Sequence, residues 1–278
     1  MSKETTLYEY VQLADKPYGF DPEKPDDHNS SKHTLPNHIQ PLDIDFQIKH
    51  TPAQPQTNLT QSPTTTTITS ADSSALNTPG QDDYDGNYYG MTYYNKATNE
   101  IIVSNRGTYN WGDIGDWPQL GVGLDTGQTA IANHYAEEVV KYIASHPQYV
   151  GVTITFVGDS YGGLQAQQQQ KHIQQLMEAA EDAASKVDKT SPYASISQIR
   201  GIATVPPGPG PIEADDKLNF LTINVAGDLV NLGGFDQAGV AEINIATTHY
   251  GPGESHYIKN TLEYFSNWGN WGRATLIG

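Results

Sequence analysis

One serine of this sequence stands where a serine hydroxyl can act as a nucleophile. Ser160 is the central residue of residues 158–162 (GDSYG), which fit the pattern Gly-x-Ser-x-Gly. The most strongly strand-like run of the chain, residues 150–157, precedes it, and a segment expected to be helical, residues 162–185, follows it. Small residues around the serine permit a tight strand-to-helix turn that presents the hydroxyl at the edge of a sheet. We therefore predict that Ser160 is a catalytic nucleophile; the alternative is an ordinary strand–turn–helix connection.

A serine nucleophile needs a base, and the base needs a carboxylate that orients it. Where such a turn carries this chemistry, the acid and then the base follow the serine along the chain. Asp228 comes three residues after a predicted strand over residues 218–225, so it is the favoured acid. Only His249 and His256 follow it, and we favour His256, which lies at the start of the last predicted helix. His249 stays open as the alternative base.

Two backbone donors are needed to stabilise the oxyanion that forms during acyl transfer. The N–H group of Tyr161, the residue after the nucleophile, is expected to be one of them. The second should come from a loop that follows an earlier strand, and Thr108, shortly after the predicted strand over residues 100–104, fits that position.

A loop over residues 109–125 follows Thr108 and combines glycines with apolar side chains. Ile114, Trp117 and Leu120 would form an apolar patch suited to an acyl chain or a lipid surface if they were exposed together. We expect this loop to act as a lid that contacts substrate. The alternative, that these side chains pack on the core, is equally consistent with the sequence.

Strands that alternate with helices predict a mostly parallel central sheet flanked by helices, the α/β-hydrolase fold class. The length of 278 residues fits one such domain, residues 1–278, with a polar low-complexity insertion at about residues 17–82. A short amphipathic helix is expected within residues 3–16. Further strands are expected over residues 88–94 and 199–205, and further helices over residues 128–145 and 258–264.

Composition excludes several classes of function. The formal net charge of −17 disfavours nucleic acid as a partner, because phosphate backbones are repelled. The sequence has no cysteine, which excludes thiolate chemistry and disulfides. No signal-like or membrane-spanning run is found, so cytoplasmic residence is the default expectation, with secretion by a signal-free route left open.

Taken together, these segments resemble the class 3 lipase family, the fungal-type triacylglycerol lipases and their bacterial relatives. The resemblance runs from Tyr88 to Tyr264, and the sequence departs from the family at Asp159, where the family has His, and at Tyr161, where it has Leu. The acid segment has one residue more than the family pattern. The matching elements are IIVSNRGT at 101–108, Asp116-Trp117, GDSYGG at 158–163, NVAGDLV at 224–230, and His256.

The resemblance implies a serine hydrolase that cleaves carboxylic esters of lipids, as a lipase or phospholipase, without metal or other cofactor. Two alternatives remain: an esterase or thioesterase acting on soluble substrates, and a lipid-binding module that keeps the fold without turnover. The expected partner is a lipid or ester substrate, with membrane-surface contact through the lid. If the chain were an exported toxin, an immunity or chaperone protein would join the partners.

Overall fold

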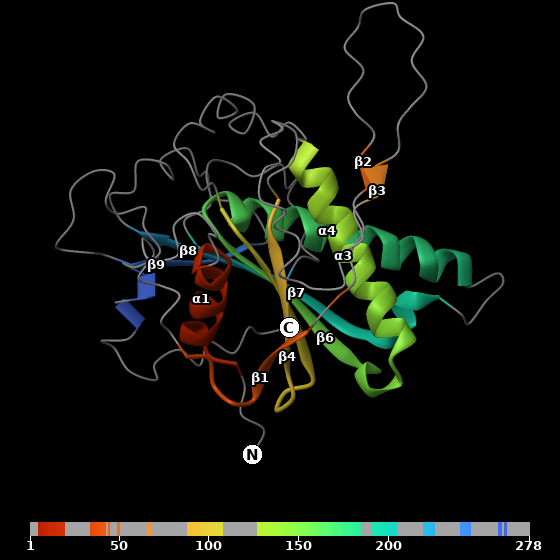
Figure 1. Ribbon diagram of the computed structural model, residues 1–278, viewed down its shortest axis with the longest axis horizontal. Coiled ribbons are helices and arrows are strands. Elements are labelled where there is room, and N and C mark those ends of the chain that lie inside the picture. The colour runs from red at the N-terminus through yellow and green to blue at the C-terminus, as the bar shows by residue number, and fades with distance from the viewer. Residues whose placement is uncertain are drawn as a thin grey trace, which may run out of the picture.

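A seven-stranded sheet forms the centre of the computed structural model, in the order β1-β4-β5-β6-β7-β8-β9 (Figure 1). The structure describes residues 5–19, 34–42, 44, 49–50, 66–67, 88–107, 127–184, 191–204, 219–225, 240–245, 261–262 and 264–265. The strands of this sheet are β1 (Ile39–Leu42), β4 (Gly90–Asn95), β5 (Glu100–Asn105), β6 (Val152–Asp159), β7 (Ile196–Thr204), β8 (Phe220–Val225) and β9 (Val240–Ile245). A separate short pair joins β2 (Lys49–His50) to β3 (Thr66–Thr67).

The five strands from β5 to β9 are parallel, whereas β1 and β4 add to one side of them as antiparallel strands. β4 and β5 form a hairpin, whose turn places Asn99 in the left-handed region at φ 54°. Parallel strands end at the same edge, so the carboxyl ends of β5 to β8 lie together. Helix α3 (Gly127–Ser145) joins β5 to β6, and α4 (Tyr161–Ala184) joins β6 to β7. Short 3-10 turns are η1 (Lys16–Gly19), η5 (Pro147–Tyr149) and η6 (Pro192–Ser195).

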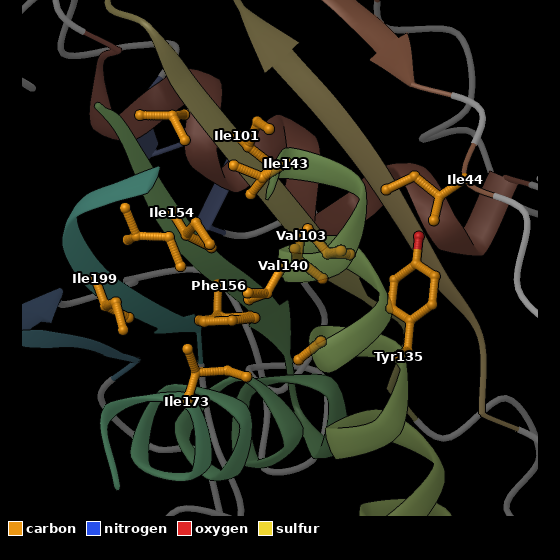
Figure 2. Close-up of a cluster of buried hydrophobic side chains, with 14 of the residues drawn as sticks. Ile44, Ile101, Val103, Tyr135, Val140, Ile143, Ile154, Phe156, Ile173 and Ile199 are labelled. Atoms are coloured by element: carbon orange, nitrogen blue, oxygen red, sulfur yellow. The ribbon is translucent and has the colours of Figure 1, made fainter. Parts of the chain in front are cut away.

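Two apolar clusters cover the two faces of this sheet. On one face, α3 and α4 pack against β5, β6 and β7, and Val140 and Ile173 meet Phe156 in the centre of the cluster (Figure 2). On the other face, Val157 and its counterparts on neighbouring strands pack against α1 (Leu7–Asp15) and against Leu262 and Phe265. Side chains alternate between the two covered faces along β6, which is why this strand is buried at nearly every position.

Helix α1 is held to the sheet by hydrogen bonds as well as by apolar packing. Its N-terminus is closed by a capping box, in which the side chains of Thr6 and Glu9 each accept from the other's backbone N–H. The buried carboxylate of Glu100 accepts from Tyr10 Oη on α1 at 2.6 Å, and from Thr155 on β6. A helix near the start of the chain is thereby tied to two central strands.

The structure confirms the predicted fold class: the chain is an α/β protein with a mostly parallel central sheet flanked by helices. The helices predicted over residues 3–16, 128–145 and 162–185 are observed as α1, α3 and α4. Two strands of the central sheet, and the short pair β2 and β3, were not predicted from the sequence. β1 lies within the segment interpreted as a polar insertion, and β9 was not recognised as a strand.

Pairing explains why β1 escaped detection. It is an edge strand of only four residues, and its middle positions, Gln40 and Pro41, are exposed. Proline is tolerated at an edge because it need not donate to a second neighbour. The buried side chain of Ile39 packs on the α1 face, and the partly buried Leu42 packs on the opposite face.

No helix among the described residues is both long and apolar enough to cross a membrane.

Candidate active site

Ser160 occupies the single-residue turn between β6 and α4, with its backbone in the left-handed region at φ 53°. This conformation costs a non-glycine residue about 1–3 kcal/mol, so it must be imposed by the surroundings. The N–H of Ser160 donates to the carbonyl of Thr204 on β7 at 2.8 Å. Its own carbonyl accepts from the N–H of Gly163 at 2.9 Å and of Leu164 at 3.3 Å, which starts the helix. The turn is therefore fixed from both sides, and the serine remains partly exposed.

The glycines of the motif are required by close approach. A Cβ on Gly158 would lie 2.1 Å from the carbonyl oxygen of Gly162, and a Cβ on Gly162 would lie 2.3 Å from that of Asn105 on β5. A Cβ on Gly163 would come within 2.9 Å of Ala203 Cβ on β7. The three glycines let β6, α4 and the ends of both neighbouring strands meet around Ser160. The strand, turn and helix predicted around the serine are confirmed.

The residue before Ser160, Asp159, is buried, and the alternation along β6 places it on the face of the sheet that carries α1. The hydroxyl of Thr204 donates to Asp159 Oδ1 at 2.6 Å. Thr204 thus holds the turn twice, through this side-chain bond and through the backbone bond to Ser160. The bond between Thr204 and Asp159 was not predicted, since the two residues are 45 positions apart and Thr204 belongs to no recognisable motif.

Tyr161 is the first residue of α4, which has 24 residues. The N-terminus of a helix carries a partial positive charge and directs backbone N–H groups outward, which favours a developing oxyanion. The ring of Tyr161 is buried and forms a small apolar cluster with Leu164. Tyr161 is therefore the first helical residue after Ser160, its side chain packs against Leu164, and the role of its N–H as an oxyanion donor stays a prediction.

The end of β5 approaches the same turn from the other side. The N–H of Arg106 donates to the carbonyl of Tyr89 at 2.9 Å, and its guanidinium lies over the Tyr89 ring, 5.1 Å from the centroid. Burial raises the pKa of Tyr89 to about 12, with the nearby Arg106 acting in the opposite direction. Gly107 is buried. The chain thus reaches Thr108 from a well-fixed strand end.

The remaining predicted site residues lie outside the described residues, so their positions remain predictions. Of their neighbours, Val225 ends β8 three residues before the expected acid and is buried, and Leu262 packs on the α1 face six residues after the favoured base. These undescribed site residues are Thr108, Ile114, Trp117, Leu120, Asp228, His256 and the alternative base His249.

Two histidines outside the predicted triad have other partners. His172 on α4 lies 2.8 Å from Glu137 on α3, and His146 bonds the carbonyl of Tyr142 at 2.7 Å. Both were set aside by the expected chain order, and neither geometry argues for a role at Ser160. In the part of the chain that the structure describes, no group of three or more acidic or histidine side chains could hold a metal ion.

Comparison with known proteins adds little to this geometry. No protein-family model matches the sequence, and no curated protein matches it. Among solved structures, the chain is similar to the Lip2 lipase from Yarrowia lipolytica, with 14% identity and a TM-score of 0.46. That match covers 90% of this chain and 81% of the lipase. A likeness this distant carries no argument about activity, which has to be argued from the site itself.

Proposed function

We propose that this protein is a serine hydrolase that cleaves carboxylic esters through an acyl-enzyme, with Ser160 as nucleophile. The observation that carries the proposal is the left-handed backbone of Ser160 at the junction of a central parallel strand and a helix. Strain at a single non-glycine residue, held by bonds from β7 and α4, is typical of a functional position. An ordinary connection would place glycine or asparagine there.

In the proposed reaction, Oγ of Ser160 attacks the ester carbonyl while His256 accepts its proton. Asp228 orients the imidazole and stabilises its charged form. The N–H groups of Tyr161 and Thr108 bind the oxyanion of the tetrahedral intermediate. The alcohol leaves with the proton from His256, and water then cleaves the acyl-serine by the same steps. The start of α4 supports this assignment, because its dipole favours the negative charge.

We propose lipid esters as the substrate class, as in a lipase or phospholipase, on the strength of the class 3 lipase resemblance. Ile114, Trp117 and Leu120 would contact the acyl chain. A soluble ester or thioester is the second candidate, and it is favoured if those side chains pack on the core. A lipid-binding module without turnover is the third, and the strained Ser160 argues against it.

The decisive experiment combines a fluorophosphonate probe with a substrate panel. The wild-type protein should be labelled at Ser160, and it should hydrolyse p-nitrophenyl esters, triglyceride emulsion or phospholipid vesicles. Ser160→Ala should abolish both labelling and hydrolysis, because triad residues act as a unit and their loss removes most of a roughly 10⁶-fold acceleration.

Ser145→Ala is the matched control, since Ser145 is exposed at the end of α3 and, among the described residues, its hydroxyl bonds its own helix and the adjacent His146. It should be labelled and active as the wild type is. Labelling at another residue, or hydrolysis by the Ser160→Ala variant, would refute the proposal. The pattern across long-chain and short-chain substrates decides between the lipid and the soluble alternatives.

A further inference from the structure

Three buried polar side chains form a closed ring of hydrogen bonds beside the candidate site. Tyr88 Oη donates to Asn105 Oδ1 at 2.7 Å, Asn105 Nδ2 donates to Gln169 Oε1 at 2.7 Å, and Gln169 Nε2 donates to Tyr88 Oη at 3.1 Å. Asn105 and Gln169 are fully buried and Tyr88 is 5% exposed. Motif analysis of the sequence pointed to none of the three.

The ring is also tied to the backbone around it. The second hydrogen of Asn105 Nδ2 goes to the carbonyl of Val157 at 3.2 Å, and that of Gln169 Nε2 goes to the carbonyl of Ala132 at 2.7 Å. Both amide nitrogens thus use both hydrogens, and each side-chain oxygen accepts at least one bond. A buried polar network satisfied to this degree is rigid, whereas an incomplete one is costly.

The elements joined by the ring are those that build the proposed site. Asn105 is the last residue of β5 and stands three residues before Thr108, and Val157 stands three residues before Ser160 on β6. Gln169 lies on α4, eight residues after its first residue, Tyr161. The backbone of Asn105 also touches α4 directly at Gly162, where no Cβ would fit. The ring therefore fixes the end of β5 against β6 and α4.

The absence of a side chain at Gly90 leaves room for the Tyr88 hydroxyl in this ring. A Cβ on Gly90 would lie 2.3 Å from Tyr88 Oη, so glycine is required for the hydroxyl to reach Asn105. Burial raises the pKa of the Tyr88 hydroxyl well above its usual value, which keeps it protonated as a donor. An apolar trio could fill the same volume, but it would not specify the direction in which the chain leaves β5.

We propose that Asn105, Gln169 and Tyr88 are positioning residues for the proposed active site. They hold the end of β5 against β6 and the first turn of α4, and thereby set where the backbone N–H of Tyr161 stands relative to Ser160. The inference rests on the proposed function, and it adds that the geometry of this turn is set by the buried ring of hydrogen bonds. Transition-state stabilisation depends strongly on such placement, so loosening the ring should slow catalysis without weakening substrate binding.

The test compares two tyrosines that differ in their contact with the ring. Tyr88→Phe removes the hydroxyl that takes part in the ring of hydrogen bonds and keeps the aromatic side chain. Tyr135→Phe is the control. Tyr135 is also buried, its aromatic ring centroid lies 5.7 Å from that of Tyr88, and its hydroxyl bonds Thr92 on β4 instead. Both variants lose one buried hydroxyl on the same face of the sheet, so comparable losses of melting temperature are expected.

We expect Tyr88→Phe to lower kcat on a short-chain p-nitrophenyl ester at least about tenfold with KM nearly unchanged, a fraction of the loss caused by deleting an oxyanion donor. The rate of fluorophosphonate labelling should fall in parallel. Tyr135→Phe should keep kcat within about twofold, because the ring beside the nucleophile stays complete. Equal changes of kcat in the two variants, or no change in either, would overturn the inference.

Gly90→Ala disturbs the ring by displacing the Tyr88 hydroxyl instead of deleting it, and it should reproduce the loss of kcat at constant KM. This variant decides the matter if Tyr88→Phe does not fold, and an unchanged kcat in folded Gly90→Ala protein would then refute the inference. A failure of the proposed function itself is recognised separately, because wild-type protein would then show neither labelling nor hydrolysis.

Discussion

The geometry around Ser160 depends on the absence of side chains at Gly158, Gly162 and Gly163. Its left-handed backbone is sterically unfavourable by itself, and it persists because β5, β6, β7 and α4 meet at this point. The contacts that a Cβ at Gly162 would make are with backbone atoms of Asn105 and Arg106, which cannot move aside as a flexible side chain can. The motif thus has a steric cause that can be tested apart from the hydroxyl.

If the proposed function holds, Gly162→Ala should reduce ester hydrolysis at least about a hundredfold, because α4 must shift away from β5 and carry the backbone N–H of Tyr161 away from its place beside Ser160. Gly151→Ala is the control: Gly151 has a positive φ of 74°, but a Cβ there would meet no atom within 4 Å. It should cost about 1 kcal/mol of stability and leave activity intact. Steady-state kinetics and urea unfolding of both variants check this. A fully active Gly162→Ala enzyme would show that the close approach to Asn105 is not needed.

Thr204 holds the turn at Ser160 through both its backbone and its side chain. Thr204→Val keeps the shape and the backbone bond to Ser160, but removes the hydroxyl that donates to buried Asp159. We expect a loss of about 1–3 kcal/mol in the free energy of unfolding, since a buried carboxylate loses a donor. Thr204→Ser retains the hydroxyl and should keep most of the free energy of unfolding that Thr204→Val loses. Equal stability of the Val and Ser variants in chemical denaturation would refute this role.

At the scale of elements, the anchoring of α1 depends on one buried carboxylate. Glu100 accepts hydroxyl bonds from Thr5 at 2.6 Å, from Tyr10 at 2.6 Å and from Thr98 at 3.3 Å, besides Thr155. Thr5 and Tyr10 belong to α1 or to the residues just before it, so the carboxylate joins the first helix to the β4–β5 hairpin and to β6. Burying a carboxylate is tolerable only when it is surrounded by such donors.

Tyr10→Phe should therefore destabilise the protein by about 1–3 kcal/mol, even though the apolar ring contacts on the sheet remain. Thr6→Ala provides a comparison within the same helix, because it removes the capping bond and should cost about 1 kcal/mol. Guanidinium unfolding monitored by circular dichroism measures both. If Tyr10→Phe were neutral, the hydroxyl bond to Glu100 would not contribute to the attachment of α1.

An element could be predicted from the sequence when its own residues carry the pattern that stabilises it, and could not when it depends on distant contacts. β6 and α4 are long, and the apolar run of β6 is dictated by burial on both faces, so both were recognised. β1 depends on pairing with β4 and has only four residues, so the sequence around it carries no pattern that predicts a strand. The same reasoning applies to the site. Ser160 belongs to a local motif and was recognised, whereas the bond from Thr204 to Asp159 and the ring of Tyr88, Asn105 and Gln169 join segments that are distant in the sequence.

At the scale of the whole molecule, tyrosine is a structural residue of this fold. The sequence has 17 tyrosines, and several hold the sheet and its helices together from buried positions. Burial raises the pKa of each of them above the ordinary value for tyrosine, and the negative Glu100 adds to the effect for Tyr10. These residues are Tyr10, Tyr88, Tyr89, Tyr93 and Tyr135.

These shifts predict a loss of stability in alkaline solution. A group whose pKa is higher in the folded than in the unfolded protein contributes its full stabilisation below the unfolded value, which is about 10 for tyrosine. Above about pH 10 the unfolded chain releases protons that the folded protein retains, so each such tyrosine lowers the free energy of unfolding by up to about 1.4 kcal/mol per pH unit. Stability should fall steeply between pH 10 and the folded pKa, about 12 for Tyr89.

Urea unfolding at a series of pH values, together with tyrosinate absorbance near 295 nm, measures this effect. The absorbance of the buried tyrosines should rise together with the loss of far-ultraviolet circular dichroism, because they ionise only when the fold opens. Tyr135→Phe removes one of these groups and should make the decline with pH shallower above about pH 10. If all 17 tyrosines ionised near pH 10 while the circular dichroism stayed native, the buried hydroxyls would be accessible to solvent, and their role in holding the sheet would have to be abandoned.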